Sequence, residues 1–178
     1  PFHVGVNLGL GITGTKAPSD HEVWPKLGMQ ANIIATYHFS ENFGIYGEIG
    51  WSQLRGLYRG VLGRIDYRLD YFNFKVAPLI YYKEGFIYVG LIGSFKMSAK
   101  QTLTDGTEPI FSPNSANFGI TAGGGWRIDF LHRIRMVLSL NFDYYFGSWI
   151  DAPSKKWHAY GFFFNIGIMF GIGKYKAN

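Results

Sequence analysis

The sequence predicts an all-β protein, an eight-stranded antiparallel up-and-down β-barrel, from three observations. Apolar residues alternate with polar or small residues along eight segments, which is the period of a strand rather than of a helix. Long and very short connections alternate between these segments, as in a meander of hairpins. The 178 residues are 19% aromatic with no cysteine, which excludes a disordered or disulfide-stabilised chain. We expect one domain over residues 1–178.

Each segment is assigned from its own pattern. The first has apolar residues at even positions from Phe2 to Ile12, and the next two have them at odd positions over 27–39 and 43–52. The fourth, 65–82, changes phase: odd positions are apolar up to Tyr71, and even positions from Phe72 onward. A β-bulge near Tyr71–Phe72 would flip the later side chains; alternatively, the first half projects beyond the layer that demands alternation. The remaining segments are 86–97, 118–130, 134–146 and 158–173.

The connections predict two different ends. They cover residues 14–26, 40–42, 53–64, 83–85, 98–117, 131–133 and 147–157. In an even-stranded meander, all the short connections then lie at one end, together with both termini. This asymmetry is typical of outer-membrane barrels, which have short periplasmic turns and long extracellular loops. We therefore expect both termini to be periplasmic.

The residue types on the two faces indicate which face points outward. The polar face is mostly Gly, Asn, Ser, Thr and Tyr, whereas a soluble lipocalin-like barrel would present Lys and Glu to water. An eight-stranded lumen is too narrow for the many large aromatic side chains of the apolar face. Aromatic residues also gather near both strand ends, as in interfacial girdles. The sequence thus predicts a transmembrane barrel of outer-membrane type, in the outer membrane of a Gram-negative bacterium, with the lipid bilayer around it.

The chain also resembles the PorT-like outer-membrane β-barrel domain common in Bacteroidota. The matching stretches are Lys26-Leu27-Gly28, Phe39-Ser40-Glu41-Asn42-Phe43, Glu48 with Trp51-Ser52-Gln53 and Gly56, Tyr71 to Pro78-Leu79 with Tyr81-Tyr82, Tyr88-Val89-Gly90 with Gly93, Phe118-Gly119 with Ala122-Gly123-Gly124-Gly125, and Asn165-Ile166-Gly167. The resemblance implies the barrel fold and the outer membrane. It assigns no catalytic residue, and the one assigned function in the family is that of a PorT-type member in type IX protein secretion.

Charged residues on the lumen face are the first candidate site. They are Glu48, Lys75, Lys96, Arg127, Arg135 and Asp143, joined by Asp66, Arg68 and Asp70 if that part of the chain also faces inward. Charges in a narrow lumen must be paired or hydrated. Glu48 and Arg127 lie at similar heights above the short turns, so we expect a polar network containing a Glu48–Arg127 pair that fills the barrel. The alternative is an ion pathway.

Other chemistry is weakly indicated. His21 with Asp20, and His158 near Ser154, would suit a lipid acyltransferase at the rim, but their spacing matches no motif, so we expect no catalytic residue. The five histidines are scattered, which predicts neither a metal site nor a cofactor. Gly123-Gly124-Gly125 is not followed by the Lys-Ser/Thr of a phosphate loop. Instead, these glycines suit curvature or the close approach of a lumen side chain.

The expected partners follow from the loops and the charge. The net charge of +5 is spread over the chain, which excludes nucleic acid but allows anionic lipopolysaccharide at the outer rim. Ile110 and Phe111, in the longest connection, are candidates for a contact with a protein partner. We expect a barrel with a filled lumen that serves as a structural or accessory subunit of an outer-membrane complex, in protein secretion or assembly. The alternatives are a small pore and, less favoured, the rim acyltransferase.

Overall fold

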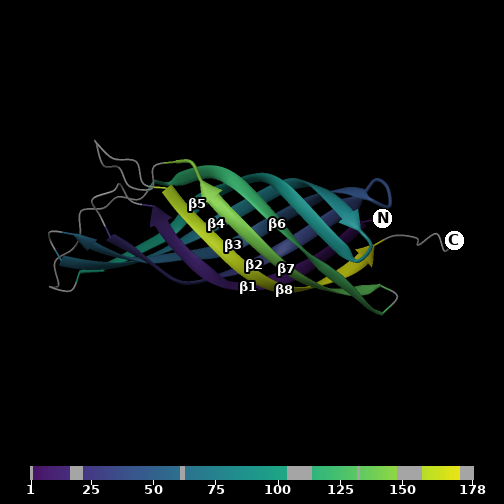
Figure 1. Ribbon diagram of the computed structural model, residues 1–178, viewed down its shortest axis with the longest axis horizontal. Coiled ribbons are helices and arrows are strands. Elements are labelled where there is room, and N and C mark those ends of the chain that lie inside the picture. The colour runs from purple at the N-terminus through teal and green to yellow at the C-terminus, as the bar shows by residue number, and fades with distance from the viewer. Residues whose placement is uncertain are drawn as a thin grey trace.

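The described residues of the computed structural model form a closed antiparallel barrel of eight strands (Figure 1). They are residues 2–16, 22–60, 63–103, 114–131, 133–147 and 158–172. The strands are β1 (Phe2–Lys16), β2 (Glu22–His38), β3 (Phe43–Gly60), β4 (Gly63–Tyr82), β5 (Gly85–Leu103), β6 (Ala116–Leu131), β7 (Ile134–Tyr145) and β8 (His158–Ile172). The predicted fold class is confirmed. No helix among the described residues is long and apolar enough to cross a membrane.

Each strand pairs with its neighbours in the chain, and β1 closes the barrel against β8. Phe2 is opposite Ile172, so the first and last strands begin and end at the same end of the barrel (Figure 1). The connections after β2, β4 and β6 also lie at this end, which we call the short-turn end; the opposite one is the long-connection end. The turn after β2 is held by the backbone amide of Phe39, which donates to the carbonyl of Phe43 at 3.0 Å.

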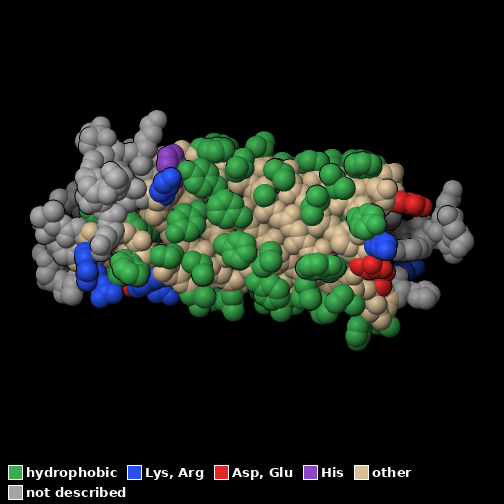
Figure 2. Space-filling view, in the orientation of Figure 1, with side chains coloured by type: hydrophobic (Ala, Val, Ile, Leu, Met, Phe, Trp, Pro, Cys, Tyr) green, Lys and Arg blue, Asp and Glu red, His purple; other side chains and the backbone are tan. Residues whose placement is uncertain are grey.

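Alternation sorts the side chains between the outside and the lumen. In β1, Leu8 is 68% exposed whereas its neighbour Asn7 is 5% exposed. Apolar side chains cover the outer wall between the two ends (Figure 2). Small and polar side chains fill much of the interior, as the sequence predicted.

The phase change in β4 has a different origin from the expected bulge. Odd-numbered residues from Ile65 to Leu79 are buried throughout, so β4 does not flip at Tyr71–Phe72. The register shift against β5 falls between Asp70 and Tyr71, and the extra residue is Met97 of β5. The bulge predicted in β4 is therefore wrong. Its apolar odd residues point inward because the lumen itself is apolar near the long-connection end.

The long-connection end contains more strand than expected. β3 and β4 stay paired out to Gly60 and Gly63, so the loop predicted over 53–64 is wrong and most of it is hairpin. β2 likewise begins at Glu22, and β5 runs to Leu103. These strands reach beyond β7 and β8 (Figure 1). The strict alternation of long and short connections accordingly fails at the third connection.

Candidate functional site

A buried lysine links two opposite parts of the barrel wall. Lys75 on β4 faces Glu48 on β3 in the strand register, and its Nζ lies 2.9 Å from Glu48 Oε1. The same Nζ lies 2.9 Å from Asp143 Oδ2 on β7. β4 pairs with β3 and β5, and β7 with β6 and β8, so the second ion pair crosses the lumen.

The two carboxylates have further polar partners. Glu48 accepts hydrogen bonds from the hydroxyl of Tyr46 and from Asn7 Nδ2, the latter at 3.3 Å. Asp143 Oδ1 accepts from Thr121 Oγ1 at 2.7 Å. Buried charges are tolerated only when they are paired and hydrogen-bonded. Together, Glu48, Lys75 and Asp143, which we call the charged triad, form an ion-paired group in which both carboxylates also accept hydrogen bonds.

A network of side-chain amides also crosses the lumen. Gln30 on β2 donates to Asn141 on β7 at 3.1 Å and also to Asn165 on β8. Asn165 Nδ2 in turn donates to Asn141 Oδ1 at 2.6 Å. Two residues further along β2, Asn32 donates to Asn7 on β1, which contacts the charged triad through Glu48. These amides occupy the polar positions of the alternation, but their connection to one another was not predicted.

Apolar and aromatic side chains fill the lumen on both sides of the polar layer. The cluster toward the short-turn end, which we call the lower cluster, consists of Ile34, Tyr46, Ala77, Leu79, Tyr81, Phe86, Tyr88, Val137 and Met169. The upper cluster, toward the long-connection end, consists of Leu54, Tyr67, Leu69, Tyr71, Ile92, Tyr145 and Ala159, with Val23 and Tyr58 packed against it. Along β4, Tyr71 belongs to the upper cluster, Lys75 to the charged triad and Leu79 to the lower cluster. The lumen is therefore filled in three layers.

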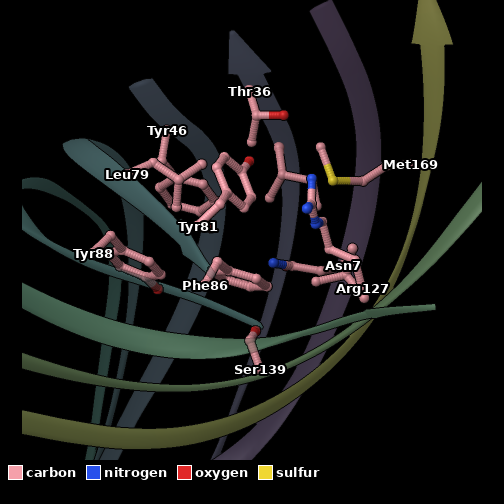
Figure 3. A pocket seen from close by; sticks show the side chains of 12 residues that line it. Asn7, Thr36, Tyr46, Leu79, Tyr81, Phe86, Tyr88, Arg127, Ser139 and Met169 are labelled. Carbon is pink, nitrogen blue, oxygen red and sulfur yellow. The ribbon is translucent and has the colours of Figure 1, made fainter. Parts of the chain in front are cut away.

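Stacked rings close the lumen at the short-turn end. The ring of His38 stacks on Tyr81 with 4.4 Å between centroids, and His3 meets His38 edge-on at 5.0 Å. The guanidinium carbon of Arg127 lies 4.0 Å from the centroid of Tyr81. Figure 3 shows Tyr81, Phe86, Arg127 and Met169 around a cavity of about 20 Å³ in this region. A cavity of that size has room for about one water molecule.

Two of the five predicted network residues lie apart from the triad. The expected Glu48–Arg127 pair is wrong: Glu48 pairs with Lys75, whereas Arg127 lies over Tyr81 and donates to the carbonyl of Lys83 at 3.1 Å. Arg135 forms an ion pair with Asp129 at 2.7 Å, near the connection between β6 and β7. Glu48, Lys75 and Asp143 are brought together as a network, and Arg127 and Arg135 belong to the short-turn end.

The other charges proposed for the lumen face outward. Asp66, Arg68 and Asp70 occupy even positions of β4, on the face opposite the buried odd residues. Asp66 pairs with Lys26, and Arg68 Nε lies 3.5 Å from Asp70 Oδ2. Their assignment to the lumen is wrong, because the odd residues of β4 point inward on both sides of Tyr71–Phe72.

The remaining candidates are placed as follows. His158 Nδ1 lies 3.3 Å from the carbonyl oxygen of Tyr145, at the start of β8. Gly123 lies within β6, where an added Cβ would come within 2.5 Å of the ring of Tyr88; this agrees with the predicted close approach of a lumen side chain. Among the described residues, no three His, Asp or Glu side chains gather as metal ligands would. Ile110, Phe111, His21, Asp20 and Ser154 lie outside the described residues.

Comparison with known proteins agrees with this geometry. A family model described as outer membrane protein beta-barrel domain matches residues 1–147. The chain belongs to this family. No curated protein matches the chain. As a member of the outer membrane protein beta-barrel family, the protein lies in the lipid bilayer of the Gram-negative outer membrane.

Solved structures of similar shape include three outer-membrane proteins. The crystal structure of OprG from Pseudomonas aeruginosa matches with a TM-score of 0.67 at 10% identity, over 96% of each chain. Neisserial surface protein A matches with a TM-score of 0.57 at 13% identity, over 96% of this chain and 97% of that one. AlkL, determined in DMPC lipid bilayers, matches with a TM-score of 0.54 at 14% identity, over 99% and 92%. At these identities the likeness establishes the fold alone.

Proposed function

We propose that this outer-membrane barrel is a non-conducting scaffold, a structural or accessory subunit of an outer-membrane complex and not an enzyme. The observation that carries the proposal is the three-layered filling of the lumen. An ion path needs a continuous column of water. Here the charged triad spans the polar layer, and an aromatic cluster lies on each side of it. Eight-stranded lumens are normally filled by side chains, whereas water-filled porins have about 16 strands.

A scaffold acts through its outer surfaces, which are the lipid-facing wall and the connections. We place both termini and the short-turn end in the periplasm and the long-connection end outside the cell, because short periplasmic turns are typical of these barrels. The resemblance to the PorT-like type favours a complex of protein secretion or assembly. Ile110 and Phe111 remain the proposed contact with a protein partner. For His158, a hydrogen-bond contact with a backbone carbonyl and a ring stacked on Tyr144 suit a structural residue.

Conductance across planar lipid bilayers tests the closed lumen. The wild type is compared with Tyr71→Ala/Lys75→Ala/Tyr81→Ala, which removes one inward side chain of β4 from each layer. The matched control, Phe72→Ala/Phe74→Ala/Tyr82→Ala, removes three outward side chains of the same strand. Vesicle flotation verifies insertion of each protein before recording. We expect steady openings from the inward variant alone, and steady nanosiemens openings from the wild type would overturn the proposal.

Isolation from native membranes tests the accessory role. The protein is extracted with a mild detergent, and its companions are identified by mass spectrometry. We expect a reproducible partner whose yield falls when Ile110 and Phe111 are both changed to Ser. A monomer without any reproducible companion would contradict the subunit role. Lipid A modification that is lost in His21→Ala or His158→Ala would instead establish the acyltransferase.

A further inference from the structure

Three rows of side chains cross the outer wall of β3, β4 and β5 near the long-connection end. Each row contains one residue from each strand, directly opposite its neighbours in the register. From the middle of the barrel outward they are the aromatic row Trp51–Phe72–Phe95, the polar row Gln53–Asp70–Ser98 and the cationic row Arg55–Arg68–Lys100. Figure 2 shows Lys and Arg side chains gathered at this end of the barrel.

The three rows lie on the face opposite the buried odd residues of β4, and within the polar row Gln53 and Asp70 are themselves buried, 5% and 9% exposed. The odd residues of β4 are buried, whereas Phe72 is 43% exposed and the side chain of Arg68 is 47% exposed. The bulge at Met97 aligns the outward side chains of β5 with those of β4. Lys96, before the bulge, is opposite the inward Tyr71, whereas Ser98, after it, is opposite the outward Asp70. One extra residue reverses the side-chain direction. Without this bulge, Lys100 would not share a face with Arg68.

Within the described part of the chain, the cationic row is only partly neutralised. Like charges that are directly opposite one another on neighbouring strands are destabilising, and this row contains two such contacts, Arg55–Arg68 and Arg68–Lys100. The carboxylate of Asp70 lies 3.5 Å from Arg68 and accepts a hydrogen bond from Ser98 at 2.8 Å. Among the residues that the structure describes, that is one carboxylate beside three cations. The neighbouring Asp66 is already paired with Lys26.

Beyond the Leu57–Asp66 pair, a second pair of arginines is opposed in the same hairpin. Arg59 on β3 is directly opposite Arg64 on β4, and the register places Glu22 of β2 beside Arg59. Arg59 and Arg64 are separated from the cationic row by the Leu57–Asp66 pair, and they lie closer to the connection between β3 and β4. An anion from outside the chain would relieve the repulsion within the cationic row.

The heights of the rows indicate where that anion comes from. Aromatic side chains of membrane barrels mark the boundary between hydrocarbon and headgroups. Arg55 follows Trp51 by four residues, which is about 13 Å of strand and about 10 Å of height at the usual tilt. The cationic row therefore lies at the headgroup layer, directly above aromatic rings that contact acyl chains. Arginine binds phosphate through paired hydrogen bonds.

We propose that Arg55, Arg68 and Lys100 bind the phosphate of an anionic lipid headgroup in the leaflet at the long-connection end. The acyl chains of this lipid pack on Trp51, Phe72 and Phe95. The site belongs to the outer wall, so it is independent of whether the lumen conducts. It selects lipid by its phosphate and by the aromatic row beneath, and a free phosphate ion meets only the first of these requirements.

Native mass spectrometry of the protein in detergent micelles tests the site. The protein is titrated with diphosphorylated lipid A, with the same lipid after removal of its phosphates, and with inorganic phosphate. The variant Arg55→Gln/Arg68→Gln/Lys100→Gln keeps much of each side-chain stem and removes three charges. The matched control Lys16→Gln/Lys83→Gln/Arg133→Gln removes three exposed charges that are not in the cationic row. Both variants are first shown to be folded by their heat-dependent migration on gels.

We expect the variant Arg55→Gln/Arg68→Gln/Lys100→Gln, the row variant, to bind diphosphorylated lipid A at least about tenfold more weakly than the wild type. The control should bind this lipid as the wild type does. Removal of the lipid phosphates should weaken binding to the wild type by a similar factor. Equal binding by the row variant and the wild type would overturn the proposal, as would equal binding of the dephosphorylated lipid. Full displacement of the lipid by inorganic phosphate would show a simple anion site instead. Preferential binding of an acidic peptide over lipid A would assign the row to a protein partner.

Discussion

The ammonium group of Lys75 lies 2.9 Å from the carboxylate of Asp143, on a strand that is not its neighbour in the barrel wall. Glu48, at the same distance on the adjacent strand, shares the positive charge. The pair with Glu48 therefore runs along the wall, whereas the pair with Asp143 joins opposite walls. This cross-lumen link separates the upper and lower clusters, and it makes Lys75 the centre of the polar layer.

Replacing Lys75 with Met should destabilise the barrel strongly. The substitution leaves two carboxylates buried without their cation, and loss of one partner of a buried ion pair costs about 3–5 kcal/mol. The free energy of unfolding is measured by urea titration in lipid vesicles, followed by tryptophan fluorescence. We expect the transition midpoint to fall well below that of the wild type.

Two further variants control this measurement. Lys83→Met removes an exposed lysine and should leave the midpoint nearly unchanged. Lys75→Met/Glu48→Gln/Asp143→Asn removes the two uncompensated charges as well, so it should recover part of the lost stability. Equal midpoints for Lys75→Met and Lys83→Met would show that the triad contributes nothing to the folded state.

The sequence located the lumen charges but paired them incorrectly, for a geometric reason. Counting residues from a turn gives the height of a side chain in the barrel, and Glu48 and Arg127 were matched by height. Counting residues in this way does not show which strands face each other across the lumen or where a long side chain bends. The Glu48–Lys75 register follows from the pairing of Gly60 with Gly63, whereas the sequence pattern predicts a longer loop there.

The phase of β4 shows a second limit of sequence patterns. A period of two separates the faces of a strand but does not say which apolar environment each face meets. Phe72 and Phe74 face outward, toward lipid, whereas Leu69 and Tyr71 face the upper cluster inside the lumen. Both environments select apolar residues, so the change from one to the other resembles a bulge. Where only one face of a strand was apolar, as in β1, the prediction was confirmed.

Adding a methyl group at Gly123 should also destabilise the barrel. A Cβ there would lie 2.5 Å from the ring of Tyr88 and 2.8 Å from the carbonyl oxygen of Leu140, so both the lower cluster and the backbone would have to shift. Overpacking of this kind costs about 1–3 kcal/mol. Gly123→Ala is measured by the same urea titration. Gly47→Ala is the matched control, because the nearest atoms to its added Cβ are 4.0 Å away; equal effects of the two changes would contradict the close packing at Tyr88.

An arginine on the outer wall should have a cost that depends on its depth in the bilayer. Leu8 lies near the middle of β1 and is 68% exposed, whereas Phe43 begins β3 beside a short turn. Arginine costs about 2–4 kcal/mol at the membrane midplane and about 0–1 kcal/mol near the interface. Leu8→Arg should therefore lower the free energy of unfolding in lipid vesicles much more than Phe43→Arg. In detergent micelles, which have no fixed midplane, the difference between the variants should shrink, because depth rather than lost packing causes it. If Leu8→Arg were as stable as Phe43→Arg in vesicles, the assignment of the β1 apolar face to the hydrocarbon core would be wrong.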